Sequence, residues 1–471
     1  MRFFKNAVFP LIIILACVML FFINLGKRGL WSPDETRYAA VSKEILYSGD
    51  WINLNRNGEA YAQKPPLFFW LISAFGILLG RISEFSARLP SALSGAAAAL
   101  ITYFFADTLF FSKRVALFSA LILITSFAYL AASQWVILDP LLLVFVILAI
   151  FTLYLGLTRP GTRLAFYLAA FFFIACGALT KGPVGLILPV LVIGFYALLI
   201  KKSRDLWTVE FVIGLIMFIL IVLAWLIPAC VKGGASYTNE LLINQIFGRF
   251  LKPFDHKEPF YFYFLRFPLE FLPWSVFLPS TIIYLVKNKI KEDAIKLIFA
   301  WFLSIFIFFT ISKSKNDLYI LPAYPAAAMA IAYYLENRIR SKTKILIYIV
   351  AGVAVLNIIL TYAVFPRFDK WKSPRYLARK IIKHIKPDDE IATFKANSVY
   401  WLYYCDRRRI KELDGFDALN SYLESGRKVF CIIESGNLEN FKENYKTKAY
   451  VLEEAPYGRK KIFTLITNGY R

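Results

Sequence analysis

Histidine and cysteine are both scarce in this chain. Its 471 residues include two histidines and five cysteines, and no CxxC or other ligand-like spacing occurs, which argues against zinc fingers and dithiol redox motifs. Cys17 and Cys176 lie in apolar stretches, as small core residues do. A disulfide between Cys405 and Cys431 is compatible with an oxidising compartment. The remaining cysteine is Cys230.

Acidic residues are a minority as well. The chain has 55 Lys and Arg against 32 Asp and Glu, a net charge of +23. Such an excess can indicate nucleic-acid binding. Here the cations gather in short clusters between apolar stretches, a pattern typical of membrane topology signals and of affinity for anionic lipid. We therefore expect membrane lipids, and no nucleic acid, as partners.

Several regular patterns are missing. The last hundred residues contain no Gly-rich phosphate loop, and the chain has no internal repeat, low-complexity segment or alternating β-barrel pattern. Apolar residues instead make up 58% of the chain, and the mean hydropathy is +0.56. They occur in runs of about 17–25 residues, the length that a helix needs to cross a hydrocarbon core of roughly 30 Å.

These runs predict a polytopic all-α membrane protein with eleven transmembrane helices. The expected spans are 8–25, 89–111, 115–133, 140–157, 164–180, 184–200, 208–230, 269–286, 294–311, 317–335 and 345–365. The first run follows Arg2 and Lys5 as in a signal peptide, but it is long and no small-residue cleavage site follows, so we interpret it as a retained helix.

The basic loops predict the orientation. With a cytoplasmic N-terminus, every short cytoplasmic loop carries Lys or Arg, as the positive-inside rule requires. The loops hold Lys113 and Arg114; Arg159 and Arg163; Lys201, Lys202 and Arg204; Lys287, Lys289 and Lys291; and Arg338, Arg340, Lys342 and Lys344. The pattern holds only if the short run 67–80 lies in the interface without spanning. This orientation predicts a multi-pass membrane protein with a cytoplasmic N-terminus.

Three segments then lie outside the cytoplasm. They are the first long loop (residues 26–66), the second long loop (residues 231–268) and the tail (residues 366–471). The tail is mixed and charged, with β-like runs at 429–433 and 462–466 and helical spacing at 376–385. We expect a membrane domain over 1–365, which includes the interfacial helix 67–80, and a small extracytoplasmic α/β domain over 366–471.

Two segments of the first long loop carry candidate functional groups. In Trp31-Ser32-Pro33-Asp34-Glu35-Thr36-Arg37, the adjacent carboxylates Asp34 and Glu35 fall in the first turn of a predicted helix, and Asp34 and Arg37 share a face. Lys64 precedes Pro65 and Pro66, which stiffen the chain, and suits an anionic headgroup. A capped helix with a structural ion pair, and a snorkelling lysine, are equally compatible with these patterns.

Further candidates lie at the expected outer ends of spans. Asp139 stands between two apolar runs, where an ionisable residue needs a cavity or a partner, although with Pro140 it also fits a helix start. Tyr319 follows a segment that holds Lys313 and Lys315, and a phosphate fits between Lys64 and a tyrosyl hydroxyl. An aromatic-belt tyrosine beside loop lysines is the alternative.

Two candidates have weaker support. Lys181, in Thr180-Lys181-Gly182-Pro183, is suited either to a headgroup contact or to a plain turn. His256 lies in the second long loop and is a candidate metal ligand, although a lone histidine is more often structural.

Together these segments resemble the C-type superfamily of membrane glycosyltransferases, and within it the aminoarabinose (lipid A) transferase and protein mannosyltransferase group. The likeness covers roughly residues 8–335. The matching pieces are Asp34-Glu35, Lys64-Pro65-Pro66, Arg88-Leu89-Pro90-Ser91, Leu138-Asp139, Thr180-Lys181-Gly182-Pro183 and Tyr319-Ile320-Leu321-Pro322. The order of these motifs, and the side of the membrane expected for them, agree with that group.

The resemblance implies an enzyme that transfers a sugar from a polyprenyl (undecaprenyl-type) phosphate to a lipid A, glycan or protein acceptor outside the cytoplasm. It assigns catalytic acidic residues to Asp34 and Asp139 and contacts with the lipid phosphate to Arg37, Lys64 and Tyr319. A single base that activates the acceptor for attack on the face opposite the phosphate implies inversion at the anomeric carbon.

The resemblance leaves the metal question open. Aminoarabinose transferases usually carry Glu before the phosphate-contacting lysine, whereas this chain has Gln63, which weakens a metal site shared with His256 and the assignment to that one sugar. No cofactor is required, and a divalent metal is compatible with the pattern. A transporter or flippase, a membrane receptor or assembly protein, and a lipid-phosphate transferase are the competing classes.

Overall fold

The computed structural model describes residues 2–242, 258–458 and 461–469. Its contacts divide the chain into two compact units. The first unit consists of Met1–Leu25, Ala62–Leu71 and Arg88–Ile358. The second consists of Gly26–Tyr61, Ile72–Ala87 and Ile359–Arg471.

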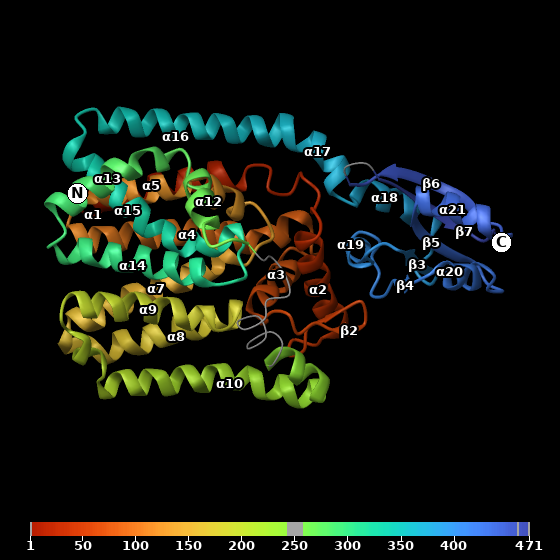
Figure 1. Ribbon diagram of the computed structural model, residues 1–471, viewed down its shortest axis with the longest axis horizontal. Helices are drawn as coiled ribbons and strands as arrows, with labels where there is room; N and C mark the ends of the chain where they lie inside the picture. The colour runs from red at the N-terminus through yellow and green to blue at the C-terminus, as the bar shows by residue number, and fades with distance from the viewer. Residues whose placement is uncertain (1, 243–257, 459–460, 470–471) are drawn as a thin grey trace. The chain divides into compact units, whose positions relative to one another are not determined.

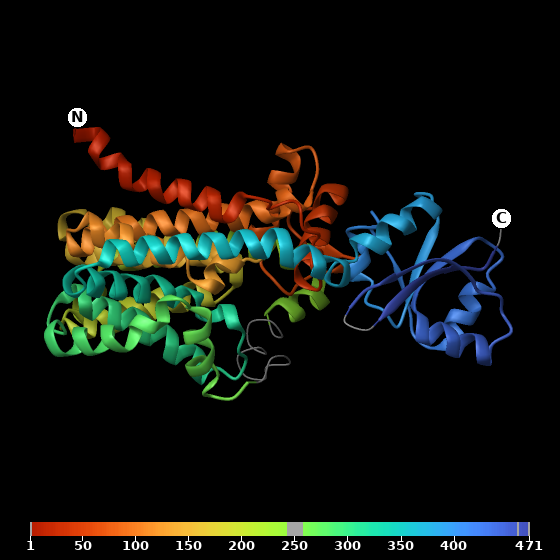
Figure 2. The same cartoon turned by 90° about the horizontal axis from the view of Figure 1, so that it is seen from above.

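The first unit is helical, as the apolar runs predict. Its elements are α1 (Arg2–Cys17), η1 (Val18–Phe22), α4 (Glu84–Phe110), α5 (Lys113–Ile124), α6 (Phe127–Ser133), α7 (Asp139–Thr158), η2 (Pro160–Thr162), α8 (Arg163–Lys181), α9 (Val184–Leu199), η3 (Ser203–Leu206), α10 (Val209–Thr238), α12 (Phe262–Glu270), η5 (Trp274–Phe277), α13 (Leu278–Asn288), α14 (Asp293–Ile311), η6 (Asp317–Ala323), α15 (Tyr324–Arg338) and α16 (Lys342–Ile359). α3 (Leu67–Leu78) and the start of α4 continue into the second unit. Long helices of the first unit lie side by side in both views (Figures 1 and 2).

The prediction of a polytopic membrane protein is confirmed. In the described part of the chain, seven helices are long and apolar enough to cross a membrane, or up to nine if each of two bent pairs is one span. The first and sixth expected spans coincide with shorter apolar helices, Ala7–Phe22 and Val184–Leu199. α3 has 12 residues, a length of about 18 Å, too short to cross the hydrocarbon core.

Two expected spans are bent, which hydropathy does not predict. The 115–133 span is α5 and α6, which meet at 71°; at the break the hydroxyl of Thr125 donates to Leu121 O and that of Ser126 to Leu123 O. Such hydroxyls compete with the helix's own hydrogen bonds. The 269–286 span is broken by 111° beside Pro273, which has no backbone N–H.

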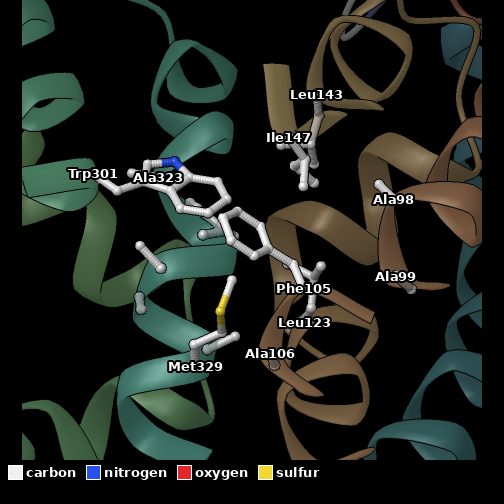
Figure 3. Packing of buried hydrophobic residues seen from close by; sticks show 14 of the residues in the cluster. Ala98, Ala99, Phe105, Ala106, Leu123, Leu143, Ile147, Trp301, Ala323 and Met329 are labelled. Atoms are coloured by element: carbon white, nitrogen blue, oxygen red, sulfur yellow. The ribbon is translucent and has the colours of Figure 1, made fainter. Parts of the chain in front are cut away.

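Aromatic and small side chains fill the space between helices of the first unit. Phe105 of α4 stacks on Phe151 of α7, with ring centroids 4.4 Å apart, and lies 5.6 Å from the Trp301 ring of α14. Figure 3 shows the Phe105 ring beside the Trp301 indole, among other buried side chains of this unit. Because lipid tails are as apolar as the side chains, close packing of this kind holds membrane helices together.

The second unit contains a five-stranded mixed sheet in the order β4-β3-β5-β7-β6. β3, β4 and β5 are mutually parallel where they pair, and β7 is antiparallel to both of its neighbours. The strands are β3 (Glu390–Phe394), β4 (Lys411–Leu413), β5 (Val429–Glu434), β6 (Tyr450–Pro456) and β7 (Ile462–Thr467), and the helices are α17 (Phe365–Lys372), α18 (Arg375–His384), α19 (Val399–Leu402), α20 (Phe416–Leu423) and α21 (Ser435–Asn444), with the short π-helix η7 (Leu360–Val364) before them (Figure 1). The predicted α/β tail is confirmed, and Cys405 and Cys431 are buried free thiols in it.

The first long loop packs with the tail inside this second unit. It forms α2 (Asp34–Ser48) and a hairpin of β1 (Asn55–Arg56) and β2 (Glu59–Ala60). Glu44 of α2 accepts hydrogen bonds of 3.1 and 2.7 Å from the Arg408 guanidinium. The Asn57 side chain donates to Ile410 O and accepts from Ile410 N. Hydropathy does not predict contacts between residues so far apart in the sequence. The predicted domain boundary at residue 365 stays a prediction.

Candidate active site

Asp34 and Glu35 open α2, as the spacing predicts. Carboxylates in a first turn are stabilised by the free amides and the dipole of the helix. Asp34 pairs with Arg37 at i, i+3, and its side chain keeps 51% exposure. The first carboxylate of the helix is therefore beside a cation and open to an incoming group.

Glu35 has the opposite environment. It is 3% exposed and receives two hydrogen bonds from the Arg28 guanidinium, of 2.8 and 3.1 Å, and one of 2.8 Å from the Trp31 amide. Charge-assisted and bidentate bonds of this kind are strong. This geometry ties Glu35 to the loop that precedes α2.

Arg37 combines a fixed charge with an unused donor. Burial opposes its charged form, but Tyr61, Tyr38 and Asp34 outweigh this and raise the pKa of the guanidinium, so it stays a cation. Its buried Nε–H has no hydrogen-bond partner among the described residues. Buried donors are nearly always paired, so an unpaired cationic donor suits an anionic or hydroxylated ligand.

In the first unit, three candidates from distant parts of the sequence meet. Lys181 Nζ lies 2.5 Å from Asp139 Oδ1 and 4.4 Å from the centroid of the Tyr319 ring. The Lys181 and Asp139 side chains are only 10% and 12% exposed. Asp139 starts α7, Lys181 ends α8, and Tyr319 lies in η6, so each charge lies at the helix end that favours its sign.

Two glycines, Gly182 and Gly185, help to place Lys181 next to Asp139 and Tyr319. Gly182 follows Lys181 with φ +72°, which closes the turn before Pro183 and α9. α8 and α9 then run back against each other so closely that a Cβ on Gly185 would lie 2.2 Å from the Gly177 carbonyl carbon. Two glycines at one helix crossing permit this approach.

The other predicted site residues are more scattered. Lys64 is half-buried in the first unit and Lys313 is exposed. Its neighbour Lys315 is buried and donates to Ser312 O and Glu258 O, so it holds the segment before η6. His256 lies outside the described residues. Within the described ranges, no group of three or more His, Cys, Asp or Glu could hold a metal ion.

One charged cluster was not predicted from the sequence. Arg266 forms a two-pronged pair with Asp317 and lies 3.5 Å from Glu270. Asp317 begins the helix η6 that carries Tyr319. Because Arg266 and Glu270 are four residues apart on α12, helical spacing was the available signal, but their link to Asp317 is a tertiary contact.

Comparisons with known proteins find one matching family and several similar sequences. The sequence pattern of the family described as dolichyl-phosphate-mannose-protein mannosyltransferase matches residues 6–243. An uncharacterised protein of Aquifex aeolicus is 31% identical over 76% of this chain and 70% of its own length. The undecaprenyl phosphate-alpha-4-amino-4-deoxy-L-arabinose arabinosyl transferase of Enterobacter sp. is 27% identical over 81% of this chain and 69% of its own length. This chain spans only 59% and 64% of the enzymes so named in Pectobacterium atrosepticum and Proteus mirabilis.

Solved structures agree on the fold. The crystal structure of ArnT from Cupriavidus metallidurans bound to undecaprenyl phosphate superimposes with a TM-score of 0.80, at 19% identity, over 98% of both chains. The archaeal oligosaccharyltransferase AglB from Archaeoglobus fulgidus, in complex with an inhibitory peptide and a dolichol-phosphate, has a TM-score of 0.58 at 14% identity, over 96% of this chain and 73% of that one.

Proposed function

This chain belongs to the dolichyl-phosphate-mannose-protein mannosyltransferase family, and from that premise we propose that it transfers a sugar from an undecaprenyl-type phosphate to an acceptor on the outer face of the inner membrane. It is a multi-pass membrane glycosyltransferase that uses a lipid-linked sugar donor. A transporter or flippase is not favoured, because the family and its relatives act by sugar transfer.

The observation that carries this function is the pairing of Asp34 with Arg37. A half-exposed carboxylate beside a cation with an unpaired, buried N–H offers a proton acceptor and an anion-binding donor within one helical turn. Sugar transfer from a lipid phosphate needs both groups, one for the acceptor hydroxyl and one for the departing phosphate.

The proposed reaction is one inverting displacement. The acceptor oxygen attacks the anomeric carbon from the face opposite the phosphate, and the bond between that carbon and the phosphate oxygen breaks as the new glycosidic bond forms. Asp34 takes the proton of the acceptor hydroxyl, or orients an acceptor that is already anionic. The electron pair of the broken bond leaves with the polyprenyl phosphate, whose charge Arg37 stabilises. From the resemblance to the family we propose Lys64 and Tyr319 as further contacts of the lipid phosphate.

The remaining candidates take supporting roles in this proposal. Asp139 holds Lys181 over the Tyr319 ring, and this group binds hydroxyls of the sugar or of the acceptor. Glu35 anchors the segment before α2 through Arg28 and the Trp31 amide. The lipid brings the activated sugar, so no nucleotide site is needed. Lipid A, a surface glycan and a protein are the candidate acceptors.

Substitution of the two main groups tests the function. We expect Asp34→Asn and Lys64→Ala each to lower transfer by roughly 100-fold or more, since they remove a proton acceptor and a phosphate-stabilising charge. Transfer of labelled sugar from undecaprenyl phosphate is measured in membranes at matched expression. Asp388→Asn and Lys202→Ala, at exposed sites, are the matched controls. Near-normal transfer by both test variants would eliminate the assignment.

The donor and acceptor for this assay come from a comparison of cells. Mass spectrometry of surface lipids, glycans and proteins, with and without this chain, should reveal one sugar that is present only when the chain is made. Lipid A, glycans and proteins that are identical in both cells would contradict a transferase.

A further inference from the structure

Four successive backbone amides just before Asp34 each donate a hydrogen bond, and three of these bonds go to the tail. The Gly29 amide donates to Asp369 Oδ2 at 3.2 Å, the Leu30 amide to the Tyr404 hydroxyl at 2.6 Å, and the Ser32 amide to Lys372 O at 3.3 Å. Only the Trp31 amide finds its partner locally, in Glu35. All of these residues belong to the second unit. The segment that leads into α2 is therefore held mainly by residues some 340 positions away.

Asp369 is the centre of this arrangement. Its carboxylate lies on α17 and is 4% exposed. Besides the Gly29 amide, it accepts a 2.9 Å bond from the Trp31 indole N–H, so each of its oxygens has one donor. The approach is close: a Cβ on Gly29 would lie 2.4 Å from Ser373 Oγ. A buried carboxylate is stable only with such hydrogen-bond donors. The Asp369 side chain and the segment of residues 29–32 therefore hold each other in position.

Tyr404 supplies the second support. Its hydroxyl accepts from the Leu30 amide and donates to Glu84 Oε1 at 3.2 Å. Glu84 in turn lies 3.5 Å from the Arg375 guanidinium, which donates to Lys27 O at 3.0 Å. Burial raises the pKa of the Tyr404 phenol well above its usual value, which keeps the hydroxyl able to donate. The start of the loop is thus fixed at Lys27 and Leu30 by one connected network.

We propose that Asp369 and Tyr404 are positioning residues of the sugar transfer: through the backbone of residues 29–32 they fix the N-terminus of α2 and hence the Asp34 carboxylate. This rests on the proposed function, in which Asp34 receives the acceptor proton. The tail is then a structural part of the catalytic apparatus. Because a reacting group displaced by about 1 Å can lose roughly 100-fold in rate, firm support of this loop bears on turnover.

The variants Asp369→Asn and Tyr404→Phe test this in the full-length protein. An asparagine offers one acceptor oxygen and one NH2 group, so either the Gly29 amide or the Trp31 indole N–H faces another donor. Phenylalanine keeps the ring and removes the acceptor for the Leu30 amide. The exposed tail residues Asp388 and Tyr376 provide the matched controls Asp388→Asn and Tyr376→Phe.

Two readouts separate positioning from general loss of structure. We expect the test variants to lower kcat by roughly 10- to 100-fold, with KM for the lipid donor changed by less than about threefold. Hydrogen exchange of the amides of residues 29–32, measured by mass spectrometry in detergent, should become roughly tenfold faster or more, whereas β5 keeps its protection. The controls should match the wild type in both measurements.

Several results would overturn the proposal. They are unchanged kcat in both test variants, a fall in kcat with unchanged exchange at residues 29–32, or exchange that rises equally in β5. The Asp34→Asn variant is assayed in parallel. If it keeps full transfer, the proposed function fails, while the exchange data still decide whether the tail holds this loop.

Discussion

At the scale of single residues, hydrogen-bond partners and burial decide which acidic side chains remain accessible to a ligand. Glu35 is buried with three donors from Arg28 and Trp31, whereas its neighbour Asp34 is half-exposed with one partner, Arg37. Helical spacing alone does not distinguish the two carboxylates, because both fall in the first turn of one helix. Their difference arises from Arg28, whose place depends on how the loop folds back.

The pair of Lys181 and Asp139 gives a prediction at this scale. Lys181→Met leaves the Asp139 carboxylate buried and unpaired and removes the cation from the Tyr319 ring, so we expect a loss of stability of about 3 kcal/mol and of transfer by at least roughly tenfold. Thermal unfolding in detergent and the transfer assay measure these effects, with Lys202→Met as control. The double variant Asp139→Asn, Lys181→Met should recover stability without activity; full activity in it would rule out a role for the pair.

Asp406 gives a prediction about pH. Burial opposes its charge, but hydrogen bonds from Lys43 and Tyr47 and the Lys43 charge prevail and hold the pKa of this carboxyl below its usual value. A lowered pKa stabilises the fold above the ordinary aspartate value of about 3.9, and this contribution disappears as the pH falls through the lower folded value.

Asp406→Asn should therefore lower the unfolding temperature at pH 7, and this difference should shrink as the pH falls below the ordinary aspartate value of about 3.9. Asparagine tolerates the positive φ of +54° at this position, so the comparison isolates the charge. Unfolding is followed between pH 7 and pH 3 for both proteins. A difference that stays constant over this range would show that the charge of Asp406 is not the cause.

At the scale of elements, short contacts decide where helices end and bend. The sequence predicts α18, β5 and β7 within one or two residues, because amphipathic spacing and β-rich runs are local properties. The breaks at Ser126 and Pro273 were not predicted, because the mean hydropathy of each bent pair stays high enough for a span. Hydropathy measures how apolar a run of residues is and carries no information on the direction of the helix axis.

The crossing of α8 and α9 gives a prediction for elements. Gly185→Ala places a Cβ against the backbone of Gly177, which forces the helices apart and moves Lys181; we expect a loss of stability of about 1–3 kcal/mol and lower transfer. Gly194→Ala on the same helix is the matched control, since a Cβ there meets no atom within 4 Å. Thermal unfolding in detergent measures both. Equal stability of the two variants would contradict tight packing at Gly185.

At the scale of the whole molecule, the distribution of charge predicts the orientation in the membrane. Lysine and arginine remain on the cytoplasmic side because their transfer across the bilayer is disfavoured. We expect an impermeant maleimide to label Asp388→Cys in intact spheroplasts and Lys202→Cys only after permeabilisation, with the labelling of the native cysteines subtracted. The reverse pattern would place the tail in the cytoplasm and remove the proposed outer-face reaction.

The sequence by itself determined the apolar helices, the α/β tail, the start of α2 at Asp34 and the candidate groups around Asp139, Lys181 and Tyr319. Each of these depends on residues close together in the chain or on a run of one chemical character. Only the tertiary structure decided that Lys181 pairs with Asp139 and that Asp369 and Tyr404 hold the amides before Asp34. Such contacts join residues 42 to 374 positions apart, and their geometry depends on how the whole chain packs.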